Sequence, residues 1–190
     1  MLNNVRKLIP LLSIMIILVL SSCSNTKRYV HRKSKKTRVE RTTATKYRTN
    51  KKRGRRETVA TLSSKRYSIV QTAKKYLGKP YNYGGKKPNS GFDCSGFTSY
   101  VYAENGIQVK GASYHQAKLG VKKSMKDLKE GDLVFFGSKR KVSHVGIVAE
   151  ADKGNIAVIH STSSRGVVID DITNSDYWRK KYLFGRDVIR

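Results

Sequence analysis

The chain has 190 residues and carries 40 Lys or Arg against 13 Asp or Glu, a formal net charge of +27. This length leaves room for one ordinary domain and excludes two, once an N-terminal extension is set aside. The charge is uneven: Lys27 to Arg56 holds fifteen basic residues and one acidic residue, Glu40, whereas Ser63 to Arg190 holds twenty-three against eleven. The excess charge therefore belongs mainly to a basic tail.

Residues 1–22 are predicted to be a lipoprotein signal peptide. Arg6 and Lys7 precede an apolar run, Leu8 to Leu20, that has the length of a secretory signal core and is short for a membrane span. The following Leu-Ser-Ser-Cys resembles a bacterial lipobox, which implies cleavage before Cys23 and lipidation of its thiol, so that acyl chains hold the protein at a membrane. An ordinary cleaved signal with an incidental cysteine is the alternative.

Residues 23–62 are predicted to form a lipidated, disordered tether. From Ser24 to about Leu62 the chain has almost no apolar periodicity and is rich in Thr, Ser, Lys and Arg. Such a composition does not bury enough apolar surface to offset the entropy of ordering. The tether is either a solvated spacer or is attracted to anionic polymers or lipid headgroups. Nucleic acid is not expected as a partner of an exported chain.

The folded domain is predicted to span residues 63–190. Ser64 is a candidate cap for a helix from about Lys65 to Leu77, and a second helix is expected from Cys94 to Asn105. A short helix is expected at 114–119. The later pattern is extended and predicts strands at 132–136, 144–149, 156–160, 167–170 and 183–189. The order indicates an α+β fold with N-terminal helices packed on a central antiparallel sheet of about five strands.

Cys94 is a candidate nucleophile. If Cys23 carries lipid, Cys94 is the only thiol left in an oxidising compartment. An unpaired cysteine is a liability there unless the protein uses its reactivity. A Cys23–Cys94 disulfide is the competing interpretation. At a loop-to-helix junction the helix N-terminus favours the thiolate, so a lowered pKa is expected, and its N–H groups suit an oxyanion. Gly96 leaves room beside the sulfur.

Two of the four histidines are candidates for the base that a cysteine nucleophile needs. His144 begins one predicted strand and His160 ends the next, so a hairpin could bring the two imidazoles together. The alternatives are ordinary strand-end histidines, or a zinc site with Cys94, although no short-spaced ligand pair is present. His31 and His115 lie on polar stretches and are set aside.

Four segments, taken in order, resemble the NlpC/P60 peptidases. They are Asp93–Phe97, Gly131–Phe135, Ser143–Ile147 and Ile159–Thr162. The resemblance covers roughly Ser64 to Arg190 and implies a papain-like fold. It also implies Cys94 as nucleophile, His144 as general base and His160 as the residue that orients the base. Tyr81–Gly85, His160–Ser164 and Tyr177–Tyr182 are most similar to the lipid-anchored murein DD-endopeptidase branch of that family.

The same resemblance implies residues that touch substrate. Tyr81 matches a tyrosine near the oxyanion, with Tyr83 as an alternative because the loop before Cys94 is one residue longer than in that branch. Asp93 and Ser95 flank the nucleophile, where some relatives bind a substrate amine. Asp93 also suits an N-cap for the helix.

The expected function is that of a cell-wall hydrolase. It would cleave amide bonds of peptidoglycan, with the D-Ala–diaminopimelate cross-link favoured and the γ-D-Glu–diaminopimelate bond possible. No metal or organic cofactor is required, and a monomer is expected. Ser24 after the lipidated cysteine is compatible with the periplasmic face of the outer membrane. The alternative is a non-catalytic lipoprotein that binds peptidoglycan.

Overall fold

The structure, a computed structural model, describes residues 38–139 and 141–190. The predicted signal peptide, Cys23 and the first part of the predicted tether lie outside these residues. Within the described ranges, no helix is both long enough and apolar enough to cross a membrane. The chain divides into two units after Tyr47, and the second unit, Arg48–Arg190, carries the sheet and the candidate site.

The first described element, α2, is a helix over Arg38–Lys74. The structure thus differs from the predicted disorder over the stretch from Arg38 to Leu62 and from the predicted helix start at about Lys65. Lys and Arg are good helix formers, and no proline occurs in this stretch, so a helix needs no apolar face to be locally favourable. The hydroxyls of Thr58 and Thr61 donate to carbonyl oxygens four residues earlier, at 2.9 and 2.8 Å.

The second predicted helix is present as α3, Cys94–Glu104, and begins at the residue expected. Asp93 has an extended backbone and its side chain accepts a hydrogen bond from the backbone N–H of Gly96, which makes it the N-cap. Asn105 ends the helix, and Gly106 follows with a φ of 71°. The short helix α4 covers Ser113–Gln116.

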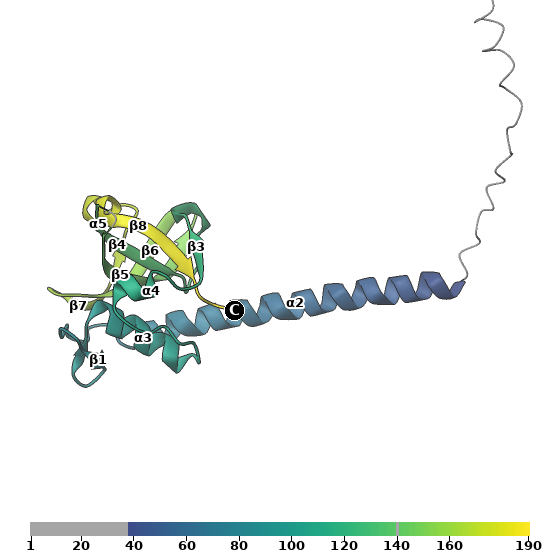
Figure 1. The fold of residues 1–190 in the computed structure, drawn as a ribbon, viewed down its shortest axis with the longest axis horizontal. Coiled ribbons are helices and arrows are strands. Elements are labelled where there is room, and N and C mark those ends of the chain that lie inside the picture. The colour runs from purple at the N-terminus through teal and green to yellow at the C-terminus, as the bar shows by residue number, and fades with distance from the viewer. Residues whose placement is uncertain (1–37, 140) are drawn as a thin grey trace, which may run out of the picture. The chain divides into compact units, whose positions relative to one another are not determined.

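Six strands form one antiparallel sheet in the order β3-β8-β4-β5-β6-β7 (Figure 1). Their bounds are β3 Val121–Lys123, β4 Leu133–Ser138, β5 Lys141–Asp152, β6 Asn155–Thr162, β7 Gly166–Asp171 and β8 Tyr182–Asp187. The predicted α+β class is confirmed. The sixth strand, β3, was not predicted because its three residues are mostly exposed and basic.

Shorter elements complete the fold. A two-stranded hairpin, β1 (Lys86–Lys87) and β2 (Gly91–Phe92), precedes α3. A 3₁₀ turn, η1, covers Met125–Asp127, and a helix of six residues, α5 (Asp176–Lys181), precedes β8. The hairpin and α5 bring loop residues to the two ends of the site described below.

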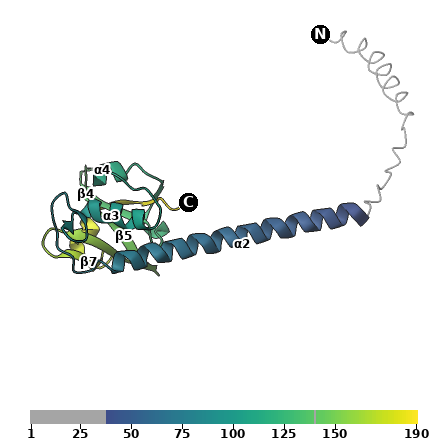
Figure 2. The same cartoon turned by 90° about the horizontal axis from the view of Figure 1, so that it is seen from below.

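Both faces of the central sheet are buried, which explains the continuous apolar run in β4. Leu133 and Phe135 belong to a core shared with α2 and α3, whereas Val134 and Phe136 belong to a second core beneath α5. Alternate side chains of a strand point to opposite faces, so each of the two cores takes every second residue. Figures 1 and 2 show α3 on one side of the sheet, and Figure 1 shows α5 near β4 and β8.

A partly buried ion-pair network joins α2 to the start of β4 and the end of β8. Arg66 donates to Oδ1 of Asp132 and to Oδ2 of Asp187, each at 2.6 Å. The side chain of Asp132 is fully buried. Burial raises the pKa of Asp132 even though Arg66 acts to lower it, whereas the pKa of Arg66 is raised by the two carboxylates against the effect of burial. Arg66 and the backbone N–H of Lys129 both donate hydrogen bonds to the Asp132 carboxylate. These two donors favour its ionised form at neutral pH.

Candidate active site

Cys94 is the first residue of α3, and its side chain is partly buried. Cys94 packs against the core cluster that contains Val145. Val145 directly follows His144 in β5, so the structure brings the sulfur to the strand that carries this histidine. Although burial raises the pKa of the thiol, the backbone N–H groups of Val145, Ser95 and Cys94 act to lower it. The last two belong to the start of α3, as expected for a helix N-terminus that stabilises negative charge.

Close backbone packing holds the start of α3 in place. A Cβ atom added to Gly96 would lie 2.0 Å from the carbonyl oxygen of Gly85, and one added to Gly85 would lie 2.4 Å from that of Gly91. Gln116 of α4 is fully buried and donates from Nε2 to the carbonyl oxygen of Ser95 at 3.0 Å. The loop before the nucleophile and α4 therefore clamp the residues that flank Cys94.

The structure brings the two predicted histidines together. Nε2 of His144 lies 3.0 Å from Nδ1 of His160, across neighbouring strands β5 and β6. A Cβ atom on Gly146 would lie 2.4 Å from Cγ1 of Val158 and 3.0 Å from the Cβ of His160, so the glycine allows β5 and β6 to pack closely beside this histidine. His160 is fully buried.

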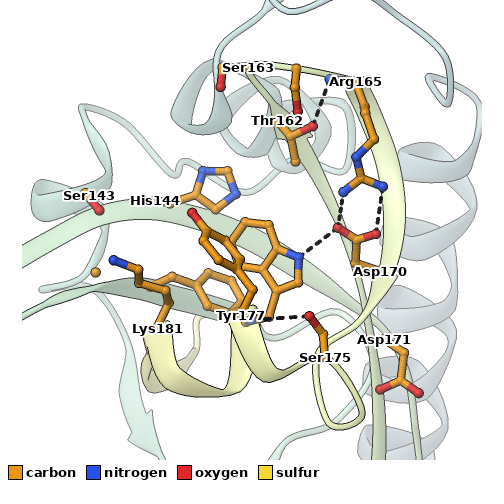
Figure 3. A pocket seen from close by; sticks show the side chains of 14 residues that line it. Ser143, His144, Thr162, Ser163, Arg165, Asp170, Asp171, Ser175, Tyr177 and Lys181 are labelled. Carbon is orange, nitrogen blue, oxygen red and sulfur yellow. Dashed lines mark hydrogen bonds and ion pairs between the residues drawn. The ribbon is translucent and has the colours of Figure 1, made fainter.

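Three further side chains, Asp170, Trp178 and Arg165, complete the cluster, and the sequence had not indicated their role. Oδ2 of Asp170 lies 2.9 Å from Nε2 of His160 and accepts a hydrogen bond from Nε1 of Trp178, also at 2.9 Å. The Trp178 ring stacks on His144 with centroids 5.3 Å apart and also contacts His160. Arg165 donates to both carboxylate oxygens of Asp170 (Figure 3).

Burial shifts the pKa values of Cys94 and His144 in the directions that favour their neutral forms. Burial raises the pKa of the Cys94 thiol, although the three backbone N–H groups act in the opposite direction. Burial, and then the neighbouring His160, lower the pKa of His144 to about 3. The sequence predicted a lowered pKa for Cys94, whereas the structure indicates a raised one, because the effect of desolvation is larger than that of the helix N-terminus. Both shifts favour a thiol and an uncharged imidazole at neutral pH.

Alkylation of Cys94 tests this charge state. In a Cys23→Ser protein, we expect the rate with iodoacetamide to rise with pH around a midpoint above about 8.5, the value of a free thiol. The sign follows because a raised pKa delays formation of the reactive thiolate to more alkaline pH. The same protein unfolded in urea should show the ordinary midpoint. A folded-state midpoint well below 8.5 would instead indicate a resting thiolate–imidazolium pair.

The structure also separates the two candidate tyrosines. Tyr81 pairs with Phe92 beside the nucleophile, and burial raises its pKa, followed by the charges of Cys94 and Asp93. Tyr83 is 90 % exposed. Tyr81 is therefore the tyrosine that lies near Cys94.

Asp93 and Ser95 are engaged with each other and with the backbone. The hydroxyl of Ser95 donates to Oδ1 of Asp93 at 2.9 Å, and the backbone N–H of Gly84 donates to the other carboxylate oxygen at 3.1 Å. With the cap to Gly96, Asp93 holds the loop and the helix in one arrangement. The capping role is thus observed, and a substrate contact stays a prediction.

A pocket of about 520 Å³ opens beside His144. Its lining includes Ser143 and Lys181 on one side and Arg165 and Asp170 on the other (Figure 3). The lining contains His144 but not Cys94. Among residues 38–139 and 141–190, no group of three or more His, Cys, Asp or Glu is arranged to hold a metal ion.

A cysteine at a helix N-terminus, packed against an antiparallel sheet with a hydrogen-bonded histidine pair, defines a cysteine peptidase class. The chain belongs to the NlpC/P60 family, whose model matches residues 78–187. The family resemblance seen in the sequence is confirmed, and with it the expectation of a cysteine-type peptidase.

Three relatives show what the chain is similar to. It is 37 % identical over 123 residues to a gamma-DL-glutamyl hydrolase of Bacillus subtilis, a match of 63 % of this chain and 29 % of that protein. The NlpC/p60 domain of the peptidoglycan hydrolase SagA is 35 % identical with a TM-score of 0.55, covering 64 % of this chain and 97 % of that domain. A Staphylococcus aureus protein of this family, described as similar to a lipoprotein, is 32 % identical with a TM-score of 0.58. That match covers 67 % of this chain and 42 % of the S. aureus chain.

The chain thus spans less than a third of the B. subtilis enzyme that it matches. These relatives do not bear on the DD-endopeptidase branch in particular, so placement in that branch stays a prediction.

Proposed function

We propose that the chain is a cysteine endopeptidase that hydrolyses amide bonds in the peptides of peptidoglycan. The observation that carries this proposal is the packing of Cys94 against the core that contains Val145 of β5, because His144, the residue before Val145, is hydrogen-bonded to His160. The naming of SagA as a peptidoglycan hydrolase supports the substrate class.

In the proposed reaction, His144 is the general base. Its Nε2 is engaged with His160, so Nδ1 is the ring nitrogen that takes the proton from Cys94. The sulfur attacks the amide carbonyl, and backbone N–H groups at the start of α3, with Tyr81 nearby, stabilise the oxyanion. The C–N bond then breaks as His144 gives the proton to the leaving amine. The acyl group stays on the Cys94 sulfur as a thioester.

Water completes the cycle. His144 takes a proton from water as it attacks the thioester, and Cys94 leaves with a proton. His160 orients His144 throughout. No metal or organic cofactor takes part in these steps.

The proposal extends to the whole chain. Residues 1–22 would direct export, Cys23 would carry lipid, residues 23–62 would link the lipid to the enzyme, and residues 63–190 would form a monomeric peptidase domain. The S. aureus relative described as similar to a lipoprotein supports a lipid anchor in the cell envelope. The outer membrane, suggested by Ser24, stays a prediction.

Digestion of purified muropeptides tests the function and the scissile bond. We expect release of fragments cut after γ-D-Glu rather than at the D-Ala–diaminopimelate cross-link, because a relative is a gamma-DL-glutamyl hydrolase. Mass spectrometry of the products distinguishes the two bonds, and a Cys94→Ala protein is the control for contaminating hydrolases. Cleavage at the cross-link would restore the bond first favoured from the sequence. Binding to intact peptidoglycan with no fragment released would instead indicate the non-catalytic alternative.

A further inference from the structure

Asp170 sits at the end of a chain of polar contacts that starts near the nucleophile. Nε2 of His144 faces Nδ1 of His160 at 3.0 Å, and Nε2 of His160 faces Oδ2 of Asp170 at 2.9 Å. The His160 side chain is fully buried, and that of Asp170 is 15 % exposed. Little bulk water competes for these contacts.

The strand register places Asp170 in this position. His160 of β6 pairs with Val168 of β7, and Asp170 pairs with Val158. Residues two apart on a strand share a face, so Asp170 lies diagonally beside His160 on the same face of the sheet.

The Asp170 carboxylate is held in its ionised form. Although burial opposes ionisation, hydrogen bonds from Arg165, His160 and Trp178 lower the pKa of Asp170 to about 2. Nη1 and Nη2 of Arg165 lie 3.0 and 2.5 Å from its two oxygens. Above about pH 4 the group can therefore only accept hydrogen bonds.

One ionised carboxylate fixes the protons of both rings. An acceptor at Oδ2 requires that His160 carry its proton on Nε2, because a neutral imidazole has a single N–H. Nδ1 of His160 then has a lone pair and accepts from Nε2–H of His144. By the same rule, Nδ1 of His144 keeps a lone pair, and this is the nitrogen that the proposed reaction uses as the base.

We propose that Asp170 is a positioning residue that, through His160, sets the tautomer of His144 and so keeps its Nδ1 free to accept the proton of Cys94. This inference rests on the proposed function. Trp178 assists it in two ways: its Nε1–H holds the carboxylate, and its ring covers both imidazoles. Burial lowers the pKa of both histidines, which is consistent with two neutral rings.

An Asp170→Asn substitution in the full-length protein is the central test. Loss of the charge permits the amide to donate to His160 and so to reverse both tautomers. On a purified muropeptide, we expect kcat to fall by about 100-fold with KM nearly unchanged, within the range seen when the partner of a functional histidine is altered. Asp176→Asn, which removes an exposed carboxylate paired with Arg179 on α5, should leave kcat unchanged.

Nuclear magnetic resonance reads the tautomers directly. In ¹⁵N-histidine-labelled wild-type protein, we expect protonated Nε2 and unprotonated Nδ1 on both His144 and His160, with the proton of at least one ring moved in Asp170→Asn. A merely structural role for Asp170 would lower stability and leave these signals unchanged. Trp178→Phe, which removes one donor to the carboxylate and keeps an aromatic ring, should lower kcat by a smaller factor in the same direction.

The outcomes separate this inference from the proposed function. If the wild-type protein cleaves muropeptides and a folded Asp170→Asn protein does so with equal kcat, the positioning role is overturned. A wild-type spectrum with His144 protonated on Nδ1 overturns it as well, whether or not the variant folds. If the wild-type protein cleaves nothing, the proposed function fails, and the wild-type spectrum still decides how the histidines are set.

Discussion

Replacing Cys94 with alanine is expected to lower kcat for muropeptide cleavage by about 10⁴-fold or more. The proposed mechanism forms a covalent bond to the sulfur, and no neighbouring group can replace it. Cys94→Ser keeps the shape of the side chain but should be nearly as inactive, because a hydroxyl is a far weaker nucleophile at neutral pH.

The matched variants sharpen this result. His144→Ala should lose almost as much activity, because the neutral thiol then has no base. His160→Ala should lose less, since water or a neighbouring polar group can orient His144 in part. Thermal unfolding of each variant, compared with the wild-type protein, checks that the fold is retained. Near-normal turnover by a folded Cys94→Ala protein would remove Cys94 from the reaction.

Replacing Arg66 with methionine is expected to lower the free energy of unfolding by about 3–5 kcal/mol at neutral pH. Methionine keeps much of the aliphatic length but leaves the buried Asp132 carboxylate without the guanidinium that pairs with it. The contact between α2 and the end of β8 through Asp187 is lost at the same time. Urea denaturation followed by circular dichroism measures the change.

The effect should depend on pH in a definite direction. Burial already raises the pKa of Asp132, and loss of Arg66 should raise it further. A raised carboxyl pKa in the folded state favours the protonated form there, so the defect should shrink as the pH is lowered toward 4. The control is Arg179→Met, which breaks an exposed pair with Asp176 and should change stability by no more than about 0.5 kcal/mol. An equal decrease in the free energy of unfolding in both variants would mean that burial does not make the Arg66 pair more stabilising than the exposed one.

Much of the fold could be predicted from local patterns. The α3 helix was expected to start at Cys94, since Asp93 is a good N-cap, and each of the five predicted strands lies within or overlaps an observed strand. The helical state of α2 before Ser64 was missed, because a basic stretch without an apolar face has the composition of a disordered segment as well as that of a solvated helix.

The candidate site could be predicted only in part, for a related reason. His144 and His160 were predicted at the ends of consecutive strands, so a hairpin was enough to suggest their contact. Asp170 depends on the register between β6 and β7, and Trp178 on a six-residue helix, α5. A pattern within one strand contains no information on either. The balance between burial and the helix N-terminus at Cys94 also requires the packed structure, because desolvation depends on neighbours distant in sequence.

The contact between glycines beside the nucleophile has a consequence for how such chains are recognised and altered. Any side chain at Gly96 or Gly85 would overlap a backbone carbonyl oxygen, so neither position tolerates even alanine without movement of the loop. In a library that samples every amino acid at each position, these glycines should be as invariant among active clones as Cys94. The Asp-Cys-Ser-Gly signature thus combines a chemical requirement for the sulfur of Cys94 with a steric requirement for glycine at position 96. Attempts to transplant the nucleophile to another scaffold would have to carry the glycine loop with it.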